Sequence, residues 1–163
     1  MSAKTTRSEV VSLRVVRCQA LPSAFAKPDL HWGVFGFPLE AEDEETEEAG
    51  EPLGPSMIII GELFAHTENE LVAVTAEAVA QLPKGFPAGL LSDDEDQFIA
   101  AFRPLAHTYK HALYDTAADF ARGLIASLRM EIPLPFPTPE PEPITRWRAP
   151  ELAHDEEPTP HTD

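Results

Sequence analysis

A run of acidic residues between two apolar segments constrains the fold of this 163-residue chain more than any other feature. The run extends from Glu40 to Glu48, with the apolar segments 32–37 before it and 57–64 after it. Carboxylates so close together along a chain repel one another and stay solvated, so they belong to a loop and not to the core. The sequence therefore predicts apolar strands joined by a hydrophilic, acidic loop over residues 40–55.

The pattern of apolar residues predicts four strands in the first half of the chain. In the first, Glu9 to Ala20, the apolar residues change faces midway, which indicates either a bulge or burial by different neighbours at the two ends of the strand. The second covers His31 to Leu39. The third, Met57 to Phe64, is apolar on both faces and is expected at the centre of the sheet. Residues 71–79 fit a helical stripe and a strand about equally well, and we favour a strand because the neighbouring strand needs a partner.

Two helices are expected after the strands. Ser92 and Glu95 fit a capping box that begins a short helix, which Pro104 should end or bend. A longer amphipathic helix is expected from about residue 106 to residue 130. Within it, Gly123 costs about 1 kcal/mol relative to alanine, which favours the close approach of a neighbouring element there.

The length of the chain allows one domain with tails. Residues 1–8 are expected to form a flexible N-terminus and residues 9–139 a single domain. Prolines at alternate positions from 133 to 143 forbid helix and predict a stiff, extended segment. Residues 140–163 are expected to form a Pro-rich, acidic, disordered tail.

Charge and cysteine content narrow the possible partners. A formal net charge of −16 argues against nucleic acid as a direct ligand, because phosphate binding needs clustered Lys and Arg. The single cysteine, Cys18, fits a reducing compartment and is expected to be a small core residue. No segment has the length of a membrane span, and arginines interrupt the apolar stretch that a secretion signal needs. A cytoplasmic protein without a membrane partner is therefore expected.

Several segments resemble the SecB-type export chaperones and their toxin–antitoxin-associated relatives. The order of elements is the first likeness: four strands, a short helix, a long amphipathic helix and an extended Pro-rich run. The segments that carry it are 56–64 and 71–79, as third and fourth strands, and 111–120, as the helix that leads into Ile132-Pro133-Leu134-Pro135-Phe136-Pro137.

The resemblance implies an α+β fold, with a four-stranded antiparallel sheet packed against a short and a long helix. It further implies a homotetramer built as a dimer of dimers. The implied activity is ATP-independent holding of unfolded or precursor polypeptides in apolar grooves, for protein export or for protection of an antitoxin. A translocation motor or an antitoxin would then be a partner.

Six apolar residues are candidates for contact with a client polypeptide: Leu21, Phe25, Trp32, Phe35, Phe37 and Phe86. Those at positions 21, 25 and 86 lie in loops between prolines, where large apolar groups need cover. The other three lie on the second strand, whose alternate residues face opposite sides, so groove lining and ordinary core packing both fit them.

A basic–aromatic triplet, Arg146-Trp147-Arg148, interrupts the acidic tail. It fits a short motif that docks on another protein, and it fits equally a tryptophan that folds back on its own domain.

No residues fit a catalytic or cofactor site. His107, His111 and Asp115 have the spacing of a metal-binding helix face, but without a further ligand nearby they are more typical of a solvated stripe. Neither a Gly-rich phosphate loop nor a nucleophile elbow is present in the sequence. We therefore expect no metal, no cofactor and no enzymatic activity.

Three functions remain open. The first is a holding chaperone for many clients. The second is a dedicated binding or assembly protein for one partner, such as an antitoxin. The third is an acidic mimic of nucleic acid that inhibits a basic protein.

Overall fold

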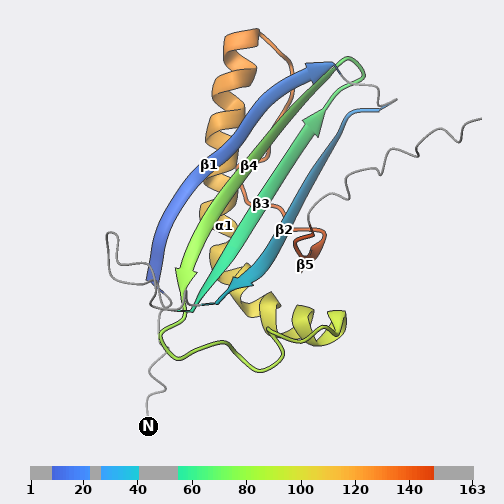
Figure 1. The fold of residues 1–163 in the computed structure, drawn as a ribbon. Coiled ribbons are helices and arrows are strands. Elements are labelled where there is room, and N and C mark those ends of the chain that lie inside the picture. Colours follow the sequence, from blue (N-terminus) through green and yellow to red (C-terminus); the bar gives the residue numbers. More distant parts are fainter. Residues whose placement is uncertain (1–8, 23–26, 41–54, 149–163) are drawn as a thin grey trace, which may run out of the picture.

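The protein has an α+β fold, which a computed structural model describes for residues 9–22, 27–40 and 55–148. Its elements follow one another in the order β1 (Glu9–Pro22), β2 (Asp29–Leu39), β3 (Ser56–His66), β4 (Glu70–Gln81), α1 (Glu95–Leu128) and β5 (Ile144–Arg146). The strands form a single sheet with α1 packed along it (Figure 1). The α+β prediction is therefore confirmed. The acidic residues 41–54 and candidate Phe25 lie outside the described residues.

Within the described residues the sheet has five strands, in the order β1-β4-β3-β2-β5. The first four pair antiparallel, as expected, but β5 pairs parallel with β2 through Val34 and Ile144. The predicted four-stranded antiparallel sheet is thus a five-stranded mixed sheet. The added strand follows Pro143, the last proline of the extended run, because only beyond it do consecutive residues carry N–H groups that can join a ladder.

The prediction of a disordered tail from residue 140 is wrong for residues 142–147, which pair with β2, whereas residues 149–163 lie outside the described residues. Backbone hydrogen bonds join residues 142–147 to the free edge of β2. The Glu142 N–H donates to the Trp32 carbonyl over 2.7 Å, and the Trp147 N–H donates to the Gly36 carbonyl over 2.9 Å. These bonds satisfy backbone groups that a sheet edge would otherwise leave to solvent.

The strand assignment of residues 71–79 is confirmed, because they lie within β4. Of the two explanations for the change of faces in β1, the bulge is found. Its pairing with β4 shifts between Val10 and Ser12 and again between Val15 and Arg17. Each shift moves later side chains to the other face, which explains why the apolar residues of this strand change faces midway.

One continuous helix replaces the two that were predicted, since Pro104 lies inside α1. Figure 1 shows the first turns of α1 running at an angle to the rest of the helix, as expected when proline removes a backbone donor and displaces a carbonyl. The cap also differs from the prediction. Asp94 is the N-cap and accepts from the Gln97 N–H over 3.1 Å, whereas the Ser92 hydroxyl accepts from the Asp94 N–H.

The core lies between α1 and one face of the sheet. Trp32 packs edge-on against Tyr114 of α1, with ring centroids 5.2 Å apart. Small residues on the strands let the helix approach. A Cβ at Gly36 would lie 2.5 Å from the Phe102 ring, so only glycine fits there. In contrast, Gly123 is exposed and its Cβ would meet nothing within 4 Å, so the close approach expected there is absent.

No helix within the described ranges combines the length and the apolar character needed to cross a membrane.

Candidate binding surface

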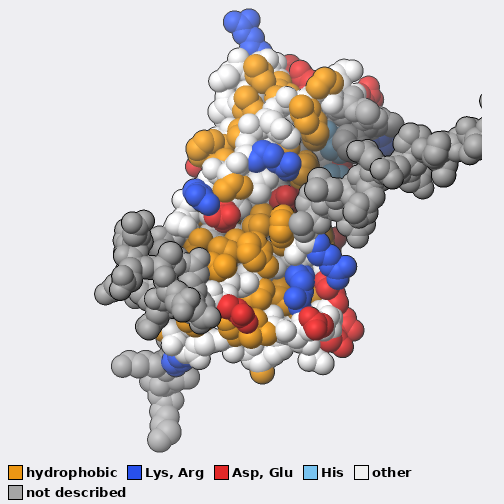
Figure 2. Space-filling view, in the orientation of Figure 1, with side chains coloured by type: hydrophobic (Ala, Val, Ile, Leu, Met, Phe, Trp, Pro, Cys, Tyr) orange, Lys and Arg blue, Asp and Glu red, His pale blue; other side chains and the backbone are white. Residues whose placement is uncertain are grey.

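The sheet face that points away from α1 carries a second set of large apolar side chains, which we call the outer sheet face. Alternate residues of a strand point to opposite faces, so neighbours of the core residues of β2 and β3 lie on this one. Its apolar members are Phe35, Phe37, Ile58, Ile60 and Phe64. Figure 2 shows hydrophobic side chains gathered across this face, with acidic and basic side chains among them.

Strand register brings these side chains together. Phe35 of β2 lies opposite Ile60 of β3, and Phe37 lies opposite Ile58. The two isoleucines are only 8% exposed although α1 packs on the other side of the sheet, so their outer-face neighbours cover them. Cross-strand aromatic and β-branched pairs of this kind stabilise a sheet by roughly 0.2–1 kcal/mol each.

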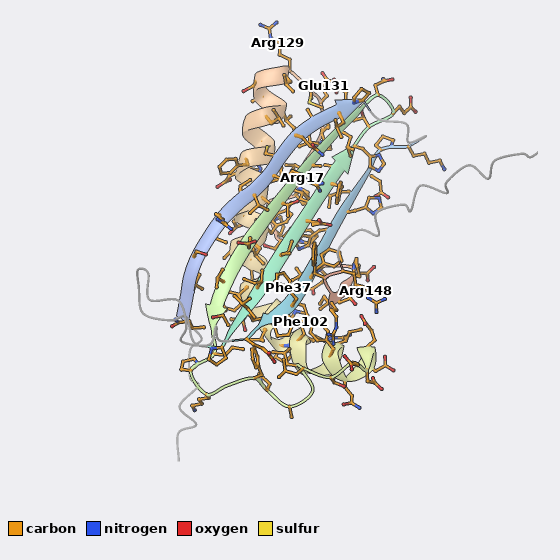
Figure 3. All side chains as sticks on the ribbon, viewed as in Figure 1. Arg17, Phe37, Phe102, Arg129, Glu131 and Arg148 are labelled. Atoms are coloured by element: carbon orange, nitrogen blue, oxygen red, sulfur yellow. The ribbon has the colours of Figure 1, made fainter. Side chains whose placement is uncertain are left out.

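Charged side chains on the outer sheet face pair with one another across strands. Arg14 of β1 donates two hydrogen bonds to Glu77 of β4, at 2.9 and 3.1 Å. Arg17 lies 3.9 Å from Glu62 and 5.6 Å above the Phe64 ring centroid. Figure 3 shows Arg17 over the middle of the sheet. Exposed ion pairs such as these contribute little to stability. Because each positive charge has a negative partner, they add no net charge to the apolar face.

A cavity of about 700 Å³ opens where the outer sheet face meets the segment that follows α1. Its lining combines aromatic and charged side chains from β1, β2, β3, the start of α1 and residues 145–148. The aromatic members are Phe35, Phe64 and Trp147, and the charged members are Arg17, Glu62, Glu95, Arg146 and Arg148.

The triplet Arg146-Trp147-Arg148 folds back onto this domain. The Trp147 ring packs on Phe37, with centroids 5.6 Å apart. Arg146 donates to the Ser92 carbonyl and lies over the Phe98 ring at 4.2 Å. Arg148, beside the β2 edge in Figure 3, is 2.8 Å from Glu95. The fold-back alternative for this triplet is therefore the one that the structure contains.

Glu95 connects the start of α1 to residues 145–148, which we call the returning segment. It accepts a hydrogen bond from the Thr145 hydroxyl and another from Arg148. The Thr145 bond, followed by the Arg148 bond, holds the pKa of the Glu95 carboxyl below its usual range. A carboxylate that stays ionised in this way serves as a fixed negative anchor at a helix N-terminus.

The remaining predicted site residues are spread over the molecule. Trp32 is 3% exposed and lies in the core on the α1 side, so it is not part of the outer sheet face. Leu21 is exposed at the end of β1, and Phe86 is half-buried against the core in the loop between β4 and α1. Of the five candidates within the described residues, only Phe35 and Phe37 share the outer sheet face as neighbours on one strand.

Sequence reasoning missed Ile58, Ile60 and Phe64 as members of the surface. The apolar character of residues 57–64 on both faces is the available signal, but by itself it also predicts a central strand that is covered on both sides. Cys18 was also misplaced, because it is exposed although it lies on a strand. It belongs to β1 at the sheet edge, which α1 does not cover fully.

Neither a protein-family model nor a curated protein sequence matches the chain. Among solved structures, it is similar to the Mycobacterium tuberculosis Rv1957 SecB-like chaperone in complex with a ChAD peptide from the Rv1956 HigA1 antitoxin. The two share 14% sequence identity, and the match covers 82% of this chain and 88% of that chain with a TM-score of 0.44.

Proposed function

We propose that this protein is a chaperone that holds non-native polypeptide on the outer sheet face, without ATP hydrolysis and without enzymatic activity. The observation that carries the proposal is an apolar surface that no helix of the described residues covers. Phe35, Phe37 and Phe64 are half-buried there, beside the cavity of about 700 Å³. Uncovered apolar surface of this kind is typical of protein-binding sites.

The chemistry of the surface suits clients of varied sequence. Apolar burial contributes about 25 cal/mol per Å² and needs no specific hydrogen bonds, so an extended apolar segment of any order can bind. The net charge of −16 favours clients that carry Lys and Arg. The sequence resemblance to SecB-type chaperones supports the same activity in the cytoplasm, with export precursors or an antitoxin as clients.

A dedicated partner is the second candidate, and the cavity supports it. Glu95 and Arg148 stand close to Trp147 on its wall, so one particular peptide with matching charges would bind better than others. An antitoxin segment would be a partner of this kind.

Aggregation assays with several unrelated unfolded proteins separate the two candidates. A general chaperone suppresses the aggregation of most of them, whereas a dedicated protein suppresses that of its own partner alone.

Phe64→Ser should weaken suppression in either case, because it places a hydroxyl on the outer sheet face. Phe136→Ser is the matched control, since this exposed ring lies over Arg122 of α1, away from that face. Equal suppression by both variants and the wild type would exclude the outer sheet face as the binding surface.

We further propose that subunits pair along β1, as the first step toward the dimer of dimers. β1 forms one edge of the sheet and carries exposed Val10, Leu13 and Val16. An edge strand with exposed apolar residues is a ready partner for a second copy. Native mass spectrometry should show a smaller assembly for Val16→Lys than for the control Leu91→Lys, which changes an exposed residue outside the sheet.

A further inference from the structure

Two histidines and an aspartate meet at the end of the sheet where β2 begins and β3 ends. Asp29 and His31 belong to β2, and His66 is the last residue of β3. One ligand atom from each residue lies within 4.8 Å of the others. The three are separated by up to 37 positions in the sequence, and strand register alone brings them together, because Asp29 lies directly opposite His66.

We propose that Asp29, His31 and His66 bind a divalent zinc ion. Two imidazole nitrogens and one carboxylate oxygen are a donor set that suits Zn²⁺, whereas Mg²⁺ and Ca²⁺ prefer oxygen ligands throughout. Three protein ligands leave the fourth tetrahedral position to water or to an incoming group.

One donor–donor distance is already close to the value that a zinc ion imposes. Donors about 2.0–2.1 Å from one tetrahedral ion lie roughly 3.3 Å from each other. The Asp29 Oδ2 atom and the His31 Nε2 atom are already 3.4 Å apart. The rings of His31 and His66 stack with centroids 5.7 Å apart and an interplanar angle of 22°. Since the ligand atoms of the three residues lie within 4.8 Å of one another, zinc binding requires the exposed His31 side chain to turn until the longer separations shorten to roughly 3.3 Å.

Local structure holds two of the ligands in place. The Asp29 Oδ1 atom accepts from the Leu30 N–H over 2.8 Å, so the other carboxylate oxygen faces His31. His66 is 4% exposed and is followed by a tight turn. In this turn the Thr67 N–H donates to the Glu70 carbonyl, and the Thr67 hydroxyl accepts from the N–H groups of Asn69 and Glu70. A site on two paired strands is more rigid than one on a loop.

Isothermal titration of ZnCl₂ into the untagged full chain tests the site. We expect one strong zinc site per chain, no comparable Mg²⁺ binding, and tetrahedral Co²⁺ absorption when Co²⁺ replaces zinc. His31→Ala and Asp29→Asn should each raise the dissociation constant about tenfold or more. Both side chains are exposed, so these variants leave the fold intact. His107→Ala, an exposed histidine of α1, is the matched control and should bind zinc as the wild type does.

Thermal unfolding gives a second readout. Zinc should raise the Tm of the wild type and of His107→Ala, since a ligand that binds only the folded state stabilises it. It should raise the Tm of His31→Ala much less. The proposal is overturned if the wild type binds no zinc, if His31→Ala and Asp29→Asn bind as tightly as the wild type, or if His107→Ala loses as much affinity as they do.

Discussion

Trp147, in the segment that follows α1, packs on Phe37 of the outer sheet face, with ring centroids 5.6 Å apart. The two residues are 110 positions apart in the chain. Their contact closes one end of the apolar surface and places the Trp147 ring on the wall of the cavity. The same surface that we propose for client binding is therefore occupied at one end by the protein's own tryptophan.

A double-mutant cycle measures this contact. Phe37→Ala and Trp147→Ala should each lower the free energy of unfolding. The double variant should lose less free energy of unfolding than the sum of the two single losses, by about 0.5–1.5 kcal/mol, which is the range measured for aromatic pairs. Urea denaturation followed by circular dichroism gives the four values. Strict additivity would mean that the two rings do not interact in solution.

Two glycines should respond in opposite ways to alanine. Gly123→Ala is expected to stabilise the protein by about 1 kcal/mol, because the position is an exposed helix interior with free space around the added methyl group. Gly36→Ala is expected to destabilise it, since the methyl group would lie 2.5 Å from the Phe102 ring. Urea unfolding midpoints of the two variants test both signs.

The contact between α1 and the returning segment should weaken in acid. The pKa of Glu95 is lowered in the folded protein, first by the Thr145 hydrogen bond and then by Arg148. Because the pKa of Glu95 is lower in the folded protein, its ionised carboxylate stabilises the folded state at pH values above 4.5, the ordinary pKa. This stabilisation is lost as the pH falls through the pKa of Glu95 in the folded state. Trp147 fluorescence should report the release below pH 4.5.

Glu95→Gln should reduce this pH dependence, because glutamine accepts hydrogen bonds without titrating. Asp96→Asn, at the next position of the same helix turn, is the control and should keep the transition. If Glu95→Gln and the wild type give the same pH profile, another group causes the release.

Trp32 should behave as a core residue and Leu21 as a surface residue. Trp32→Ala removes a 3% exposed ring that packs on Tyr114, so the free energy of unfolding should fall by about 3–5 kcal/mol. Leu21→Ala, at 44% exposure, should change it by no more than about 0.5 kcal/mol. Denaturant titration gives both values. A mild effect of Trp32→Ala would contradict the core packing.

Local patterns explain why much of the fold was predictable. The alternation along β2 and the amphipathic stripe of α1 depend on neighbours within a few residues, and periodicity reports such neighbours well. At residues 71–79 periodicity fitted helix and strand alike, and the pairing with β3 and β1 decided for the strand. Pro104 is the exception among local signals. Proline usually ends a helix, but here side chains on both sides of Pro104 are buried in the core, which holds α1 together across a bend. They are Phe98 and Phe102 before the proline and Ala106 and Tyr109 after it.

By itself, the sequence determined the strands, the amphipathic helix and the alternation that puts Trp32 and Phe35 on opposite sides of β2. It did not determine which of those sides α1 would cover, that residues 144–146 would join the sheet, or that Asp29 and His31 would meet His66. Each of these depends on register between segments far apart in the chain. A shift of one residue in the register moves every side chain of a strand to the opposite face of the sheet, so only the folded sheet determines these three features.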